Sequence, residues 1–115
     1  MSVRRKLEFL GTQYNNSLFN CLHASFLVAS ELLIPEKNNI LICTFKYNNN
    51  KSHVVVTQDN LYFDLWVGAI LDRKFNIIYK FSFFNQDRYN KFYLDNKPNT
   101  INFINIGYVN EYNRN

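Results

Sequence analysis

The chain is poor in cysteine and glycine, and it lacks a long apolar run. Only two cysteines, Cys21 and Cys43, occur among its 115 residues, which excludes a disulfide-rich secreted scaffold. Two cysteines and two histidines without clustered spacing predict no metal site, and no cofactor is expected. No apolar run of about 18 residues predicts a membrane span. Because no signal segment is recognisable at the first residues, we expect cytoplasmic synthesis, with delivery into a target cell left open.

What is present indicates a folded chain. Hydrophobic residues make up 47% and aromatic residues 17%, too apolar a composition for a disordered protein, and the length predicts a single domain over 1–115. The net charge of +4 is spread over single basic residues apart from Arg4-Arg5-Lys6, so neither a nucleic-acid surface nor a membrane partner is expected. With 19 asparagines and three glycines, asparagine should supply many of the turns.

One segment carries a clear helical pattern. Apolar residues spaced by three or four mark one helix face between Ser17 and Ile34: Leu18, Leu22, Phe26, Ala29 and Leu33. Pro35 ends this helix, and either Ser17 or Asn20 caps its start. A shorter helix is expected over Val3 to Leu10.

The sequence after Pro35 has the texture of strands separated by asparagine-containing breaks. A three-stranded meander is predicted over Asn39–Tyr47, His53–Thr57 and Leu61–Asp64. Two more strands, Phe75–Phe84 and Ile101–Val109, flank a polar segment from Asn85 to Thr100. The predicted fold class is therefore α+β, an N-terminal helix that bears Cys21 packed on an antiparallel sheet.

Cys21 lies near the start of the main predicted helix. Unpaired backbone N–H groups and the positive end of the helix dipole stabilise a thiolate at such a position. The alternative is that Cys21 is a small apolar residue on a half-buried helix. Cys43, within a strand-like apolar run, is expected to be a reduced core thiol.

Two residues of the meander favour the catalytic alternative when they are considered together. His53 opens one predicted strand at the sheet edge, and Asp64 ends the next. Antiparallel pairing across the Asp59-Asn60 turn would bring the carboxylate beside the imidazole, where it orients the ring and stabilises its charged form. Taken singly, His53 could be a solvated strand-end residue and Asp64 a turn former.

The order cysteine, histidine, acid and its local context resemble the papain-like cysteine peptidase superfamily, especially its small bacterial toxin and effector domains and the peptidase domains of bacteriocin exporters. The resemblance covers about Gly11 to Val67. Its motifs are Gln13, Asn20-Cys21-Leu22-His23-Ala24, Ser52-His53-Val54-Val55-Val56 and Tyr62-Phe63-Asp64-Leu65. The glycines that commonly flank the family's nucleophile are missing.

The resemblance implies Cys21 as nucleophile, His53 as general base and then acid, and Asp64 as the residue that orients His53. It implies Gln13 as an oxyanion-hole amide, a role that Asn15 or Asn16 could fill instead. His23 lies two residues from Cys21, on another helix face, and is expected to be a surface or packing residue. Trp66 either shelters the His53–Asp64 pair or belongs to the core, and we expect the core.

The expected function is that of a small thiol hydrolase, a protease or glutamine deamidase, acting as a bacterial toxin or effector on a protein substrate. A cognate immunity or inhibitor protein is a candidate partner. Two alternatives stay open. One is a peptidoglycan amidase of the same superfamily. The other is a non-catalytic binding or immunity domain whose aromatic strands from Phe75 to Val109 form a partner surface.

Overall fold

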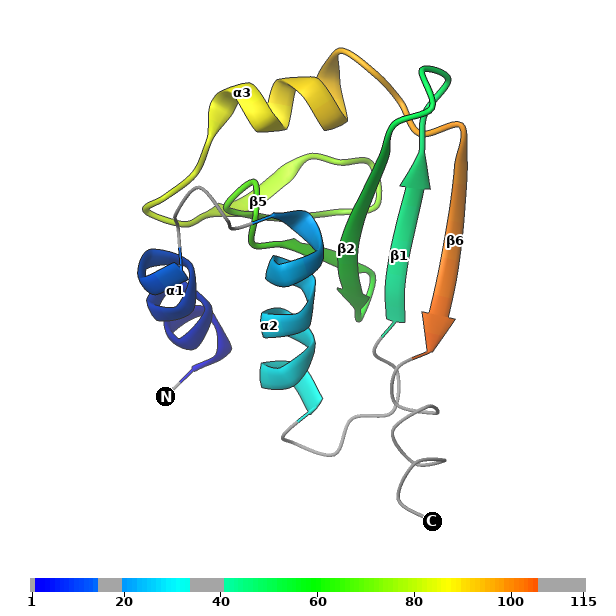
Figure 1. Ribbon diagram of the computed structural model, residues 1–115. Coiled ribbons are helices and arrows are strands. Elements are labelled where there is room, and N and C mark those ends of the chain that lie inside the picture. The colour runs from blue at the N-terminus through cyan, green and yellow to red at the C-terminus, as the bar shows by residue number, and fades with distance from the viewer. Residues whose placement is uncertain (1, 15–19, 34–40, 106–115) are drawn as a thin grey trace.

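Helices cover both faces of one antiparallel sheet in the computed structural model, which describes residues 2–14, 20–33 and 41–105 (Figure 1). The sheet order is β5-β4-β3-β2-β1-β6. In sequence order the elements are α1 Val3–Tyr14, α2 Cys21–Leu33, β1 Leu41–Lys46, β2 Ser52–Gln58, β3 Leu61–Asp64, β4 Ala69–Leu71, β5 Ile77–Lys80, α3 Gln86–Tyr89, the π-helical turn η1 Asn90–Leu94, and β6 Thr100–Asn105. The fold class is α+β, as the sequence predicts.

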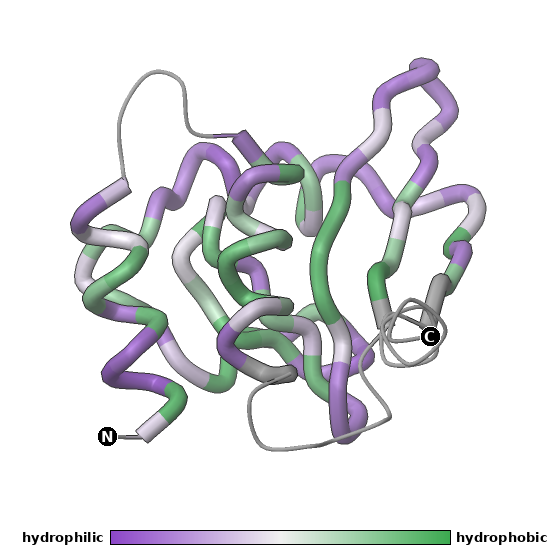
Figure 2. The backbone as a smooth tube through the Cα atoms, turned by 60° about the horizontal axis from the view of Figure 1, so that its bottom comes forward, coloured by the Kyte–Doolittle hydropathy of each residue, from purple (hydrophilic) through white to green (hydrophobic). Residues whose placement is uncertain are grey.

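Two apolar cores lie on the two faces of the sheet. Successive strand residues point to opposite faces, so Val56 packs with α1 and α2 while Val55 packs with α3 and η1. The first core also holds Leu7 and Val28, and the second is rich in aromatic rings. Figure 2 shows hydrophobic residues concentrated along the inner segments and hydrophilic residues at the β1–β2 hairpin tip.

The predicted meander is confirmed as β1, β2 and β3, which pair antiparallel in sequence order. The two-residue turn Asp59-Asn60 joins β2 to β3 with φ of 54° and 65°. Both residues adopt the left-handed conformation that a tight hairpin turn requires and that glycine usually supplies. Asn50, with φ of 64°, does the same in the β1–β2 turn, so asparagine replaces glycine as expected.

The prediction for the C-terminal half was partly wrong. The strand expected over Phe75–Phe84 is only β5, and β4 was missed. The segment from Asn85 to Thr100, expected to be polar, contains α3 and η1 and buries Tyr89, Phe92 and Tyr93 in the second core. The strand expected over Ile101–Val109 is β6, and its last four residues lie outside the described ones.

Helix α2 begins at Cys21, and its cap is Asn20, whose side-chain oxygen accepts from the His23 N–H at 2.9 Å. The other candidate cap, Ser17, and the end at Pro35 lie outside the described residues. The shorter predicted helix is confirmed as α1 and extends to Tyr14. No described helix is long and apolar enough to cross a membrane.

The expected apolar face of α2 was partly wrong, since Leu22 and Phe26 are 48% and 57% exposed. The buried face instead carries mostly small residues: Ala24, Ser25, Val28 and Ala29. Small side chains let α2 approach β2 closely, and the Ser25 hydroxyl lies 2.8 Å from the Cys21 carbonyl and 3.0 Å from the Val54 carbonyl. This bridge fixes the start of α2 against β2.

Candidate active site

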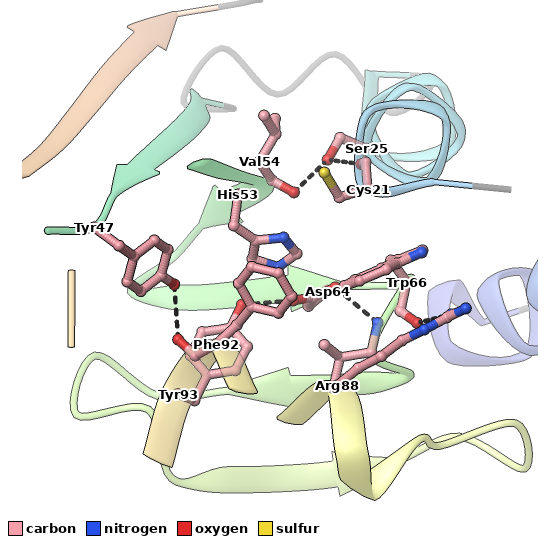
Figure 3. Close-up of polar contacts among 11 residues, drawn as sticks. Cys21, Ser25, Tyr47, His53, Val54, Asp64, Trp66, Arg88, Phe92 and Tyr93 are labelled. Carbon is pink, nitrogen blue, oxygen red and sulfur yellow. Dashed lines mark hydrogen bonds and ion pairs between the residues drawn. The ribbon is translucent and has the colours of Figure 1, made fainter. Parts of the chain in front are cut away.

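Cys21 is the first residue of α2, and its side chain is partly buried. The Asn20 cap and the Ser25 bridge to Val54 hold this helix end beside the first residues of β2. In Figure 3 the sulfur of Cys21 lies on the same side of the His53 ring as Ser25 and Val54. A thiol therefore meets an imidazole at the positive end of a helix.

His53 lies on β2 in the interior of the sheet and is completely buried, so it is neither at a sheet edge nor solvated. Aromatic rings enclose it. Phe92 stacks on the imidazole with ring centroids 4.5 Å apart, and Trp66 and Tyr93 contact it at 5.5 and 5.8 Å. A ring held this tightly cannot rotate freely, so its two nitrogens keep fixed directions.

Asp64, the last residue of β3, is equally buried and faces His53 across the two strands. The pairing of Val56 with Phe63 brings His53 and Asp64 to diagonal positions on one face of the sheet, within reach of their side chains. The His53 Nε2 lies 2.6 Å from the Asp64 Oδ2. The structure thus brings these two residues together as the sequence predicted.

Two further groups donate hydrogen bonds to the carboxylate of Asp64. The Tyr93 hydroxyl donates to Oδ2 at 2.5 Å, and the Val67 N–H donates to Oδ1 at 2.9 Å. Burial raises the pKa of Asp64, but the charge and hydrogen bond of His53, together with these donors, hold the pKa below its ordinary value. These contacts favour the ionised form of the carboxylate in a fully buried position.

The ionised carboxylate sets the proton affinity of His53. Burial lowers the pKa of the imidazole, but the charge and hydrogen bond of Asp64, helped by Cys21, raise it to about 9. Burial likewise raises the pKa of the Cys21 thiol, while the nearby polar ring and positive charge of His53 lower it by more, so its pKa lies below the ordinary value. Both shifts favour a thiolate beside an imidazolium.

The two ring nitrogens of His53 face different partners. Nε2 faces Asp64, which leaves Nδ1 for the thiol of Cys21. Within the described residues, Nδ1 makes no hydrogen bond of ordinary geometry. Catalytic contacts are often long in a free enzyme and shorten when substrate binds. The arrangement can therefore transfer a proton between sulfur and Nδ1 while Asp64 holds the other side of the ring.

The other residues singled out from the sequence lie in different surroundings. Gln13 is exposed on α1, and its oxyanion role stays a prediction. Asn15 and Asn16 lie outside those residues. His23 is exposed and contacts Tyr14 edge-on, in agreement with a surface position. Trp66 is partly buried between His53 and Arg88.

Sequence reasoning missed the residues that surround the pair from α3 and η1. Tyr93 binds Asp64, Phe92 stacks on His53, and the Tyr47 hydroxyl donates to the Phe92 carbonyl at 2.7 Å. The signal was available: Tyr89, Phe92 and Tyr93 are spaced by three and four residues, which is typical of a buried helix face. The surrounding asparagines and charges hid it.

The described residues contain no cluster of three or more His, Cys, Asp or Glu side chains that could hold a metal ion. Comparison with protein-family models, curated proteins and solved structures found no match.

Proposed function

We propose that the protein is a small papain-like thiol hydrolase that attacks an amide bond of a protein with Cys21. The observation that carries this proposal is the buried pair of His53 and Asp64 next to a thiol at a helix start, with Nε2 and Oδ2 only 2.6 Å apart. A fully buried, ionised carboxylate is costly unless it is paired, so such a pair beside a partly exposed thiol favours a catalytic role.

The chemistry follows from the three groups. The Cys21 thiolate attacks the carbonyl carbon, and the C–N bond breaks as His53 donates its Nδ1 proton to the departing amine. A thioester on Cys21 remains, and His53 then takes a proton from the water that hydrolyses it. Throughout, Asp64 stays ionised, holds the ring in place and stabilises its positive charge.

The oxyanion formed during attack needs hydrogen-bond donors close to Cys21. The first backbone N–H groups of a helix have no partner within the helix, and Asn20 caps that of His23. The N–H groups of Cys21 and Leu22, which have no partner within α2, are the proposed backbone donors. Gln13, implied by the family resemblance, is the proposed side-chain donor once substrate is bound.

Peptide cleavage and glutamine deamidation share all of these steps, so product analysis must separate them. We suggest incubating bacterial lysate proteins with the protein and with its Cys21→Ala variant, then mapping new amino termini and glutamine-to-glutamate conversions by mass spectrometry. Cys43→Ala is the matched cysteine control. New termini or conversions that require Cys21 but not Cys43 would support the proposal.

The same samples should include purified muropeptides. New amine ends there, without changes in protein, would assign the protein to peptidoglycan amidases instead. Products that persist with Cys21→Ala would contradict a thiol mechanism, and the absence of any Cys21-dependent product would favour a non-catalytic binding domain. The proposed biological role, a toxin or effector held in check by an immunity protein, predicts growth inhibition on expression that Cys21→Ala abolishes.

A further inference from the structure

A pocket of about 290 Å³ lies at the β1–β2 hairpin. The residues that line it come from the end of β1, the turn and the start of β2: Lys46, Tyr47, Asn50, Lys51 and Ser52. Two of them are lysines, and Asn50 and Ser52 offer neutral hydrogen-bonding groups. Such a lining suits an anionic group, because ammonium ions supply the charge and the amide and hydroxyl supply direction.

A third lysine approaches the pocket from η1. Lys91 follows Asn90 in this turn, and its Nζ lies 5.5 Å from the centroid of the Phe92 ring, which in turn contacts Tyr47 at 5.8 Å. The proximity of Lys51 lowers the pKa of Lys91, as expected for two cations that lie close together.

Among the described residues, acidic side chains do not neutralise this group. The ion pairs of the described residues are Lys6–Glu31 and His53–Asp64, and neither includes a lysine of the pocket. All three lysines are exposed and reach solvent. Their charges are thus left to act on a molecule that comes from outside.

The pocket adjoins the candidate active site. Ser52, in its lining, directly precedes His53, and Tyr47, also in its lining, binds the backbone of Phe92, whose ring stacks on His53. Figure 3 shows Tyr47 and Phe92 beside His53. The lining of the pocket is therefore continuous, through Ser52, Tyr47 and Phe92, with the residues that surround His53.

We propose that Lys46, Lys51 and Lys91 form a binding site for a carboxylate of an acidic peptide, so that the hydrolase selects an amide close to an aspartate, a glutamate or a free C-terminal carboxylate. This inference rests on the proposed function for its meaning as substrate selection. The anion site itself can be tested without any activity.

Binding is tested by nuclear magnetic resonance on the ¹⁵N-labelled protein, titrated with N-acetylglutamate and, separately, with the neutral isostere N-acetylglutamine. Saturable shifts of the Asn50, Lys51 and Ser52 amides with the glutamate compound alone are expected. They should disappear in a Lys51→Gln/Lys91→Gln double variant and persist in Lys80→Gln, a matched charge change on the opposite edge strand β5. Equal shifts with both compounds, or shifts that survive the double variant, would overturn the anion site.

A second measurement connects the pocket to Cys21. The alkylation rate of Cys21 by anionic iodoacetate is divided by its alkylation rate by neutral iodoacetamide. Lysine charges close to the thiol attract the anionic reagent, so they should raise this ratio severalfold, and 0.5 M salt should reduce the effect. The double variant should lose this enhancement, while Lys80→Gln keeps it. A ratio unaffected by the double variant would separate the pocket from the thiol and contradict substrate selection.

The two proposals fail in different ways. If N-acetylglutamate binds but Cys21 reacts no faster than Cys43 with either reagent, the anion site stands and the hydrolase proposal fails. If Cys21 is strongly reactive while the double variant changes neither the amide shifts nor the alkylation ratio, the hydrolase proposal stands and the anion site fails.

Discussion

The start of α2 and the middle of β1 each hold one cysteine, and they surround it in opposite ways. Cys43 is completely buried opposite Val55 and Phe103, and burial raises the pKa of its thiol to about 12, offset only slightly by Arg73. Burial acts in the same direction on Cys21, yet His53 lowers the pKa of that thiol below its ordinary value. The difference between the two pKa values therefore comes from the charge of His53. Burial without such a charge raises the pKa of a thiol and makes it unreactive.

The largest expected effect is on stability, and it comes from removing the Asp64 carboxylate that pairs with His53. Asp64→Ala leaves His53, the Tyr93 hydroxyl and the Val67 N–H buried without their partner, and it should cost about 3 to 5 kcal/mol of the free energy of unfolding. Urea denaturation measures this. The exposed Asp95→Asn is the control and should change stability by less than about 0.5 kcal/mol. A cost below about 1 kcal/mol for Asp64→Ala would contradict a buried ion pair.

Removal of the imidazole should make Cys21 resemble Cys43. In His53→Gln the thiol keeps the desolvation cost of burial but loses the charge that opposes it, so its iodoacetamide alkylation rate at pH 7 should fall about 10- to 100-fold. Peptide mass spectrometry follows both cysteines in one sample. His23→Gln, an exposed histidine on the same helix turn, should leave the rate unchanged. An equal fall in both variants would mean that His53 has no special role.

Removal of the Tyr93 hydroxyl measures how much η1 stabilises the Asp64 carboxylate. Tyr93→Phe removes a buried hydrogen bond to a charged group and should cost about 1.5 to 3 kcal/mol, whereas Tyr89→Phe removes a bond to the neutral Phe75 carbonyl and should cost about 1 kcal/mol. Chemical denaturation of both variants compares them. Equal costs would indicate that the Asp64 carboxylate is not ionised.

The smallest predicted effect is a pH dependence. Because the folded pKa of His53 is raised to about 9, its contribution to stability is complete below about pH 6.5 and is lost as the pH rises toward 9. Measured in Cys21→Ala, to remove the thiol titration, the free energy of unfolding should fall by about 1 to 2 kcal/mol between pH 6.5 and 8.5. Asp64→Asn in the same background should flatten this slope, and a slope that survives would assign it to another group.

Local patterns predicted the part of the fold that precedes Asp64. The β-branched run Val54-Val55-Val56 and the Asp59-Asn60 turn predict the β2–β3 hairpin, and this hairpin alone brings His53 and Asp64 together. The position of Cys21 followed from the helix start that Asn20 caps. These features depend on sequence neighbours, so their signals lie within short windows of sequence.

The second half of the site could not be found in that way. The buried surroundings of His53 come from Phe92 and Tyr93, about 40 residues away, and depend on how η1 crosses the sheet. The face of α2 was misjudged for a related reason: close packing on β2 favours Ala24 and Ser25 and leaves Phe26 outside. Packing between residues far apart in the sequence determines both the surroundings of His53 and the buried face of α2. Such packing is not visible in the spacing of apolar residues.

The central claim is that His53 and Asp64 make Cys21 a reactive thiolate. Timed alkylation of the folded protein with iodoacetamide at pH 6.5, followed by peptide mass spectrometry, measures the rates of both cysteines under identical conditions. The lowered pKa of Cys21 and the pKa of about 12 for Cys43 predict that Cys21 reacts at least about 100-fold faster. Equal rates for the two cysteines would contradict the account.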